Sequence, residues 1–332
     1  MADGFGFPRS TARRGQAAAL PFLVTGGCGF IGAQLTAALV ARGDAVRVLD
    51  DLSNGSVTAL PPTVELIQGD IADPAVVRHA MQGVCGCFHL AGFASVPQSQ
   101  RQWLNAHRTN LTGTVNVLDA SHRERPPSPV PVVYASTAAI YGNHENMLLA
   151  ERLPGKPISS YGADAVGAEL HARIARAVHG VPAIGLRLFN VYGPRQSAEA
   201  TYASAVAVFC DALRRRRPIT IFGDGHQMRD FVYIDDAVAA LLAAMEHLPL
   251  VPEVLNVATG RGVSLLQLVA EIAALCGVEP ALAFAPARLG DARYLVGDPA
   301  RAQDYLGFRA ETDLATGLGT MLQSLDDALP AI

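Results

Sequence analysis

Three glycines at a fixed spacing point to a loop that holds a phosphate-bearing ligand. Gly26, Gly29 and Gly32 lie in the segment TGGCGFIG, directly after an apolar run and before a helix-length segment. Such glycines permit a tight turn, let the backbone approach a pyrophosphate and pack helix on strand, while the helix N-terminus faces the anion. A merely tight strand-to-helix turn is the alternative. The pattern predicts a dinucleotide-binding loop.

Carboxylates follow the next two expected strands. Asp50 ends the second strand, 18 residues past Gly32, where a carboxylate can bind both ribose hydroxyls and repel a 2′-phosphate. It therefore favours NAD over NADP. Asp51 either shares this site or is solvated. Asp70 follows the third strand, where it meets the adenine edge or caps the next helix.

These residues need a scaffold that brings the ends of several strands together. From Pro21 the chain alternates short β-rich runs with helix-length segments, which is typical of a parallel sheet covered on both faces. Right-handed crossovers then give a doubly wound, Rossmann-type α/β fold. After Asn190 the rhythm changes, which predicts a smaller C-terminal α/β substrate lobe. Strands are expected at 22–25, 45–50, 64–68, 85–90, 130–136, 183–189 and 254–257, and helices near 30–42, 74–82, 103–122, 161–179, 235–247, 202–217, 264–275, 299–306 and 312–325.

Composition excludes several classes of protein. With 50% hydrophobic and 17% charged residues over 332 positions, the chain is too apolar to be disordered and forms one large or two modest domains. No apolar run approaches the roughly 20 residues that span a bilayer. Residues 1–20 suggest a flexible leader rather than a secretory signal, so we expect a cytoplasmic protein with no membrane partner. A formal charge of −4 argues against nucleic acid as a partner, and the five cysteines predict no metal site.

The motifs together resemble the extended short-chain dehydrogenase/reductase family, and within it the nucleotide-sugar 4-epimerases that act on UDP-glucose and UDP-N-acetylglucosamine. The resemblance extends from about Phe22 to the last helix. It rests on TGGCGFIG (25–32), DDLSNG (50–55), HLAGFASVP (89–97), STAAIYG (136–142), YGAD (161–164), RLFNVYGPRQ (187–196), ITIFGDG (219–225) and RDFVYIDD (229–236).

The resemblance implies two domains and NAD as cofactor. An NAD-binding domain would comprise residues 21–189 and about 235–260, and a nucleotide-sugar-binding domain residues 190–234 and 261–332. The implied cofactor contacts are Gly26, Gly29, Phe30, Ile31, Gly32, Asp50, Asp51, Asn54, Gly55, Asp70, Ile71, Leu90, Ala91 and Gly92.

The resemblance also implies the chemistry. Family members oxidise a sugar hydroxyl by hydride transfer to NAD, and the epimerases return the hydride to the opposite face of C4. Tyr161 matches the family's base, and Thr137 matches the Ser or Thr that hydrogen-bonds the same hydroxyl. Ser136 is expected to assist. The alternative for Thr137 is a hydroxyl that bonds its own backbone at the end of a strand.

One position departs from the family pattern. The fourth residue after Tyr161 should be Lys and is Ala165, and Lys156 lies before the helix between Gly155 and Pro157. Losing an ammonium roughly 4 Å from a phenolate removes on the order of 4 kcal/mol of attraction, so Tyr161 should titrate nearer its free value of about 10. Either an inactivating substitution was made to trap a ligand, or a natural sequence has lost or rerouted its base. Because the other catalytic and binding elements of the family are intact, the sequence favours the inactivating substitution.

Substrate residues are implied on the C-terminal half. Arg229 and Arg288 match the family's diphosphate contacts, with Arg195 as a weaker candidate, because bidentate arginines suit phosphates. Leu295 occupies the position that limits the C2 substituent, and its intermediate bulk leaves both hexose and N-acetylhexosamine substrates open. Further contacts are implied for Asn190, Ser95, Val96 and Tyr192.

Other functions remain as alternatives. Sugar-nucleotide dehydratases carry Asp-Glu after the Thr, and decarboxylases carry a Glu there, whereas this chain has Ala138 and Ala139. Ala165 as a native residue would fit a non-catalytic protein that binds NAD and a sugar nucleotide. By analogy with the family, the helices at 103–122 and 161–179 predict a homodimer.

Overall fold

A computed structural model describes residues 20–144, 147–196 and 204–327. Most of the expected leader and the start of the helix expected at 202–217 lie outside these residues. In the described part, no helix is long and apolar enough to cross a membrane.

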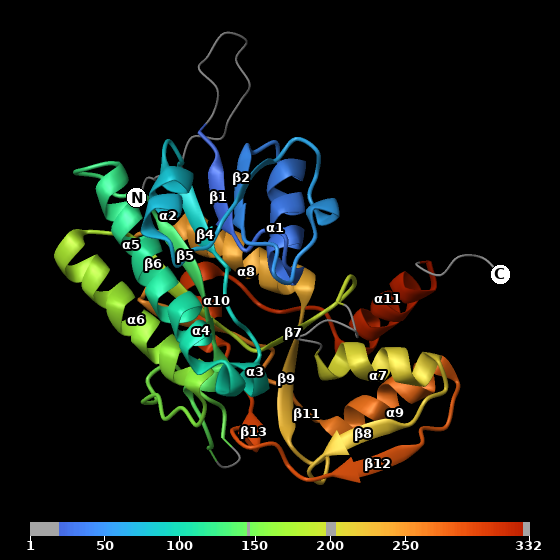
Figure 1. Cartoon of the computed structure of the whole chain (residues 1–332). Helices are drawn as coiled ribbons and strands as arrows, with labels where there is room; N and C mark the ends of the chain where they lie inside the picture. The colour runs from blue at the N-terminus through green and yellow to red at the C-terminus, as the bar shows by residue number, and fades with distance from the viewer. Residues whose placement is uncertain (1–19, 145–146, 197–203, 328–332) are drawn as a thin grey trace, which may run out of the picture.

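A seven-stranded parallel sheet forms the larger layer of the molecule (Figure 1). Its order, β10-β6-β5-β4-β1-β2-β3, runs outward in both directions from β1 and β4, which is the doubly wound arrangement expected from the sequence. The carboxyl ends of parallel strands lie at one edge, so this topology gathers the motifs that follow the strands. The strands are β1 (Phe22–Thr25), β2 (Val46–Asp50), β3 (Glu65–Gln68), β4 (Gly86–His89), β5 (Val132–Thr137), β6 (Ala183–Leu188) and β10 (Val254–Val257).

Helices cover both faces of this sheet. On one face α5 packs between α2 and α6, and on the other α8 packs against α1 and α10. The long strands are buried on both sides, as β6 shows with six consecutive buried residues. These helices are α1 (Phe30–Ala41), α2 (Pro74–Met81), α5 (Gly113–Glu124), α6 (Ser160–His179), α8 (Ile234–His247) and α10 (Ala300–Leu306).

The single helix expected at 103–122 is divided. A short helix α4 (Trp103–His107) leads into a π-helical turn at Arg108–Thr112, and α5 follows. Asn110 lies in this turn, where its side chain accepts a hydrogen bond from the Phe93 amide (2.7 Å) and donates one to the Phe93 carbonyl (3.3 Å). The bounds expected for this helix agree with the continuous helical segment over 103–124, but the π-helical turn within it was not expected, because helical periodicity does not report a contact between residues 17 positions apart.

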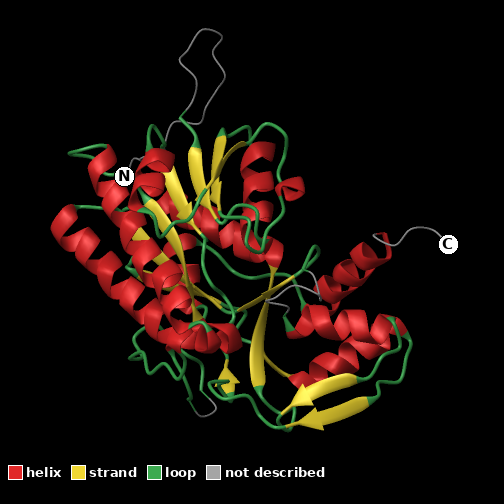
Figure 2. Ribbon diagram, in the orientation of Figure 1, coloured by secondary structure: helices red, strands yellow, loops and turns green. Residues whose placement is uncertain are grey.

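The C-terminal half adds a smaller lobe (Figure 2). Strand β9 (Met228–Tyr233) pairs with β7 (Asn190–Tyr192), β11 (Gly262–Ser264) and β13 (Tyr294–Leu295), while β8 (Ile219–Phe222) pairs with β12 (Leu282–Ala285). The helices of this lobe are α7 (Ala205–Arg214), α9 (Leu265–Cys276) and α11 (Leu314–Asp327). Helix α3 (Val96–Arg101) lies instead beside α4 and α6.

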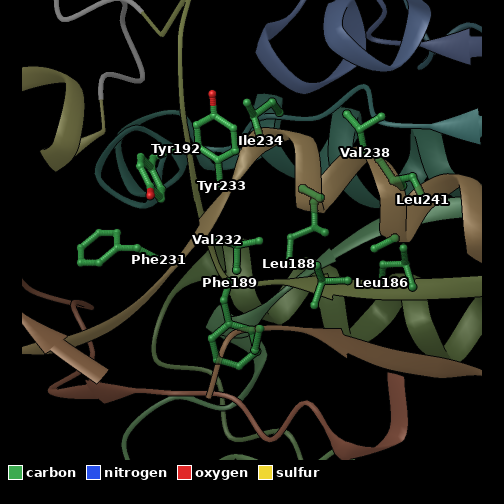
Figure 3. Packing of buried hydrophobic residues seen from close by; sticks show 14 of the residues in the cluster. Leu186, Leu188, Phe189, Tyr192, Phe231, Val232, Tyr233, Ile234, Val238 and Leu241 are labelled. Carbon is green, nitrogen blue, oxygen red and sulfur yellow. The ribbon is translucent and has the colours of Figure 1, made fainter. Parts of the chain in front are cut away.

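Tyr192 belongs to the core rather than to a ligand site. Its side chain is 1% exposed and packs edge-on against Phe231 and Tyr233 (Figure 3). Its hydroxyl donates to the Leu314 carbonyl at 3.4 Å. A Cβ added at Gly317 would lie 2.2 Å from the Tyr192 hydroxyl oxygen. The expected sugar contact from Tyr192 is therefore wrong, because packing against Phe231 and Tyr233 leaves almost none of its side chain exposed to a ligand.

A buried histidine joins strands to a helix beneath the sheet edge. His89 ends β4, and its Nδ1 hydrogen-bonds the Thr25 hydroxyl (2.7 Å) while Nε2 hydrogen-bonds Thr114 (3.0 Å). Burial lowers the pKa of His89 from 6.5 to about 4. The folded state therefore holds a neutral imidazole between these two pH values, where the unfolded chain binds a proton.

Acidification should consequently destabilise the fold through His89. The stabilisation is complete above pH 6.5 and is lost as the pH falls to 4, by about 3 kcal/mol. Denaturant unfolding from pH 7 to pH 4 should show this slope in the parent and in a His79→Gln control, whose side chain is exposed. His89→Gln keeps a donor and an acceptor but does not titrate, and an unchanged slope in that variant would contradict the assignment.

Candidate active site

The glycine loop forms a tight cradle at the start of α1. Gly26 has φ +70°, and a Cβ there would lie 2.6 Å from the Ala91 nitrogen. A Cβ on Gly32 would lie 2.0 Å from the Gly26 carbonyl oxygen. Gly29 is the N-cap of α1 and supplies no side chain to the free N–H groups of the first turn, which begins with Phe30 and Ile31. These amides are available to a pyrophosphate.

Asp50 lies beside this cradle at the end of β2. One carboxylate oxygen accepts the Cys28 amide (2.9 Å) and the other the Leu52 amide (2.8 Å). Burial raises the pKa of Asp50, and these two hydrogen bonds oppose the rise. Because each oxygen has further acceptor capacity, the buried carboxylate can also accept ribose hydroxyls.

The loop after β2 closes over the glycine cradle. A Cβ on Gly55 would lie 2.6 Å from the backbone of Cys28, so the loop packs tightly on this segment. The side chain of Asp51 accepts from the Ser53 amide (2.9 Å) and hydroxyl (2.6 Å) and is exposed, as is Asn54. Of the two expectations for Asp51, the solvated one describes this conformation.

The loop after β3 differs from one expectation. Asp70 accepts the Ala72 amide (2.8 Å) and pairs with Arg108 (3.1 Å), while Asp73 caps α2. The alternative of Asp70 as a helix cap is therefore wrong, because the chain makes one more turn before the helix begins. The Ile71 side chain is buried and would contact any Cβ on Gly113, and the Ile71 carbonyl accepts a hydrogen bond from the Asn116 side chain (3.0 Å).

The loop after β4 completes the cradle. The Leu90 amide donates to the Thr25 carbonyl (3.1 Å) and the Ala91 amide to the Thr25 hydroxyl (3.2 Å). Gly92 lies against the Asn110 side chain. Ser95 caps α3, accepting the Gln98 amide at 3.3 Å, and Val96 begins that helix.

Thr137 and Tyr161 meet at the same sheet edge. Thr137 ends β5, and Tyr161 lies in the first turn of α6, which Ser159 caps by accepting the Gly162 amide (3.1 Å). The Thr137 hydroxyl lies close to the Tyr161 phenol and lowers the pKa of that phenol. The Thr137 oxygen also accepts the Ala139 amide (3.2 Å), which is the backbone bond expected as the alternative for this residue, while its contact with a sugar hydroxyl stays a prediction.

The phenol lacks a cationic neighbour. Burial raises the pKa of Tyr161 above its ordinary value of 10, and the Thr137 hydroxyl opposes this rise. Within the described residues, no charged side chain contributes to that shift. Ala165 lies one turn further along α6. The pKa therefore exceeds the free value expected from the sequence, because desolvation of the phenolate adds to the missing charge.

Ser136 is engaged elsewhere. Its hydroxyl donates to Glu169 at 2.7 Å, and Glu169 is paired with Arg187. The expectation that Ser136 assists at the reacting hydroxyl does not fit this conformation, because adjacent residues of a strand point to opposite faces.

A cavity of about 260 Å³ lies in the smaller lobe, over β7, β8 and β9. Arg229 is buried there and hydrogen-bonds Asp291, while the Arg288 guanidinium stacks 3.8 Å from the centroid of the Phe222 ring. Asn190 also lines the cavity. Two arginines, an amide and an aromatic ring suit a nucleoside diphosphate, whose phosphates need cations and whose base needs a flat surface.

The remaining expected contacts lie outside this cavity. Arg195 is exposed with φ +70°, and Leu295 pairs with Arg229 in the β13–β9 ladder. Phe222 and Asp291 were missed by sequence reasoning, although ITIFGDG and the segment after Arg288 contain them. In the described part of the chain, no cluster of three or more His, Cys, Asp or Glu side chains is arranged to hold a metal ion.

Comparisons with known proteins agree with this geometry. UDP-glucose 4-epimerase of Azospirillum brasilense is 34% identical over 91% of each chain. The crystal structure of UDP-glucose 4-epimerase from Thermotoga maritima with UDP-glucose covers 94% of this chain and all of its own, at 33% identity and TM-score 0.88. The structure of MoeE5 with UDP-glucose and NAD covers 93% of this chain and all of its own, at 31% identity and TM-score 0.85.

A protein-family model matches the seven-stranded sheet and the first part of the smaller lobe. It is that of the NAD dependent epimerase/dehydratase family and matches residues 22–258, from β1 to the region just past β10. Both the match and the glycine cradle, which a Cβ would fill, agree with a dinucleotide site at this sheet edge. The chain therefore belongs to the NAD-dependent epimerase/dehydratase family, within the extended short-chain dehydrogenases/reductases.

Proposed function

We propose that this protein is an NAD-dependent nucleotide-sugar 4-epimerase for a UDP-hexose or UDP-N-acetylhexosamine, and that Ala165 makes its turnover slow. The observation that carries the proposal is that Thr137, at the end of β5, and Tyr161, in the first turn of α6, meet at the sheet edge. Two hydroxyl-bearing groups that meet there can grip one sugar hydroxyl and move its proton. The named functions and ligands of the relatives support UDP-sugars as the substrate class.

The cofactor would lie along the edge formed by the loops after β1, β2 and β4. The amides at the start of α1 would hold the pyrophosphate, and the Asp50 carboxylate the adenosine ribose hydroxyls. When bound, NAD supplies a hydride acceptor for the oxidation of C4. The main chain of Leu90, Ala91 and Gly92 would form the wall of this site.

The protein's own residues would handle the proton. Thr137 would orient the C4 hydroxyl, and Tyr161 would remove its proton and later return it. Because burial raises the pKa of Tyr161, the phenol stays protonated at neutral pH. The base is therefore present in its active form in only a small fraction of molecules, which accounts for slow turnover without a loss of ligand binding.

The substrate would extend into the cavity of the smaller lobe. Arg229 and Arg288 would bind the diphosphate, with Asn190 beside it. The exposed Arg195 and the half-buried Leu295 remain candidates for the sugar end.

A second candidate function is a non-catalytic protein that binds NAD and a sugar nucleotide. Ala165 and the protonated phenol favour it, because both leave the binding residues intact while weakening the base. Dehydration or decarboxylation fits less well. The positions after Thr137 are Ala138 and Ala139, in a short 3₁₀ turn, and neither side chain can donate a proton.

Restoring the cation should restore the chemistry. Ala165→Lys should raise the rate of UDP-galactose/UDP-glucose interconversion by at least about 100-fold, because the ammonium stabilises the phenolate. The rate should also reach its plateau at a lower pH than in the parent. Adding Tyr161→Phe to Ala165→Lys should remove the gain.

The rate of Ala165→Lys, together with the identity of the bound ligands, separates the epimerase from the non-catalytic protein. Mass spectrometry of ligands released from the purified parent protein should detect NAD, which both candidates require. No increase in rate for Ala165→Lys, with NAD bound, would favour the non-catalytic protein and overturn the epimerase.

Arginine lies over an aromatic ring at three places in the described chain, and two of them give a matched pair of variants. Arg288 lies 3.8 Å from the Phe222 centroid in the cavity, and Arg301 lies 5.6 Å from the Tyr305 centroid outside it. Arg288→Met should weaken UDP binding by about 10- to 100-fold, since hydrogen bonds to charged groups contribute about 1.5–3 kcal/mol. Calorimetric titration should show Arg301→Met unchanged. Equal losses in both variants would refute the assignment.

The outer face of α6 supports the proposed homodimer. Leu170, Ile174 and Val178 are 48%, 52% and 67% exposed and follow helical spacing along one side. Trp103 and Leu104 on the adjoining α4 are also exposed, at 67% and 84%. A stripe of this kind fits helix-on-helix pairing with a second copy.

Ile174→Asp should therefore shift the protein from dimer to monomer in sedimentation velocity at micromolar concentration. Fluorescence of Trp103, the single tryptophan, should move to longer wavelength as the interface opens. Leu250→Asp is the control, because Leu250 is 87% exposed in a loop after α8. A parent protein that sediments as a monomer would rule out this interface.

A further inference from the structure

A buried carboxylate connects the helix that carries Tyr161 to the strand that carries Thr137. Glu169 lies two turns past Tyr161 on α6. One of its oxygens accepts the Ser136 hydroxyl (2.7 Å) and the Arg187 Nε (2.8 Å), and the other accepts Arg187 Nη2 (2.7 Å). Ser136 and Arg187 are direct partners across β5 and β6. Glu169 therefore holds α6 to two neighbouring strands at one point.

This contact is rigid and electrically balanced. The side chains of Arg187 and Glu169 are only 7% and 12% exposed, so water does not compete for the bidentate pair. Arg187 Nη1 also donates to the Tyr141 hydroxyl (2.9 Å), which in turn donates to Asn256 Oδ1 (2.7 Å). The guanidinium compensates the carboxylate, and neither group contributes to the electrostatics of Tyr161.

Ser136 is the member of this network nearest to the reacting pair. It directly precedes Thr137 in β5, and its hydroxyl donates to Glu169. A displacement of Ser136 would therefore move Thr137 with it, since consecutive residues of a strand share a peptide plane. At its N-terminus α6 is held independently, because a Cβ on Gly162 would lie 2.6 Å from the Ala139 carbonyl oxygen.

We propose that Glu169, acting through Ser136, is a positioning residue that sets the distance between the Thr137 hydroxyl and the Tyr161 phenol. This inference rests on the function proposed above for that pair and extends it to a residue that touches neither substrate nor cofactor. The Thr137 hydroxyl can stabilise the phenolate only while the two oxygens stay close together. Loosening Ser136 should weaken this stabilisation without removing either partner.

A double-mutant cycle tests this coupling on the protein alone. Tyr161 is replaced by 3-fluorotyrosine, and its ionisation is followed by ¹⁹F NMR in four backgrounds: parent, Ser136→Ala, Thr137→Val and the double variant. Thr137→Val should raise the pKa of residue 161 by about 1, because a hydrogen bond to a charged group is lost. Ser136→Ala should raise it by about half as much in the parent and produce no further rise beside Thr137→Val. Ser136→Thr, which keeps the hydroxyl, should leave the pKa at the parent value.

Two results would overturn the inference: an unchanged pKa in Ser136→Ala, or an equal rise in the presence and absence of Thr137. If Ser136→Ala does not fold, Glu169→Gln takes its place in the cycle, since the amide retains one of the two acceptor atoms. The measurement uses neither NAD nor a sugar. Its failure is thus distinct from failure of the proposed epimerase, which the interconversion assay of Ala165→Lys decides.

Discussion

The proposed chemistry depends on the close approach of the Thr137 hydroxyl to the Tyr161 phenol. The two residues are 24 positions apart, and neither can reach the other unless β5 and α6 are fixed relative to each other. Ser159 fixes the start of the helix, Gly162 allows it to rest on the backbone after β5, and the Glu169–Arg187 pair holds it further along. The parallel sheet supplies the rest, because β5 ends at the same edge as the glycine cradle.

The cavity of the smaller lobe and the sheet edge near Tyr161 differ in their cationic side chains. Arginines line the cavity of the smaller lobe, where Arg229 and Arg288 suit a diphosphate. At the sheet edge, by contrast, the phenol of Tyr161 has no cationic neighbour among the described residues, and burial holds it in its neutral form. On the proposed function, ligand binding and proton transfer therefore depend on separate groups. On the same proposal, Ala165 in place of the family's Lys would slow proton transfer and spare ligand binding.

Much of the scaffold was predictable because its signals are local. The strand alternation and the glycine spacing predicted the doubly wound sheet, which the structure and the relatives confirm. Element boundaries agreed within a few residues for strands such as Phe22–Thr25 and helices such as Pro74–Met81. The tertiary contacts were not predictable in the same way. In the π-helical turn at Arg108–Thr112, the Asn110 side chain accepts the Phe93 amide from another loop. The Tyr192 hydroxyl fits against Gly317, where a Cβ would lie 2.2 Å from it.

Some residues of the site were likewise predicted from the sequence, and others were not. Asp50 was predicted from the end of a strand, whereas Thr137 and Tyr161 were predicted from the resemblance to the epimerase family. The engagement of Ser136 by Glu169 could not be predicted, since it requires knowledge of which face of β5 meets α6. Asp291 was missed for a related reason, because its partner Arg229 is 62 residues away in the sequence.

A crystal structure of the protein with NAD and UDP-glucose would test the central claim most directly. The account predicts the C4 hydroxyl of the sugar within hydrogen-bond distance of both the Thr137 Oγ1 and the Tyr161 Oη, with the diphosphate on Arg229 and Arg288. A sugar bound with C4 remote from either oxygen would contradict it.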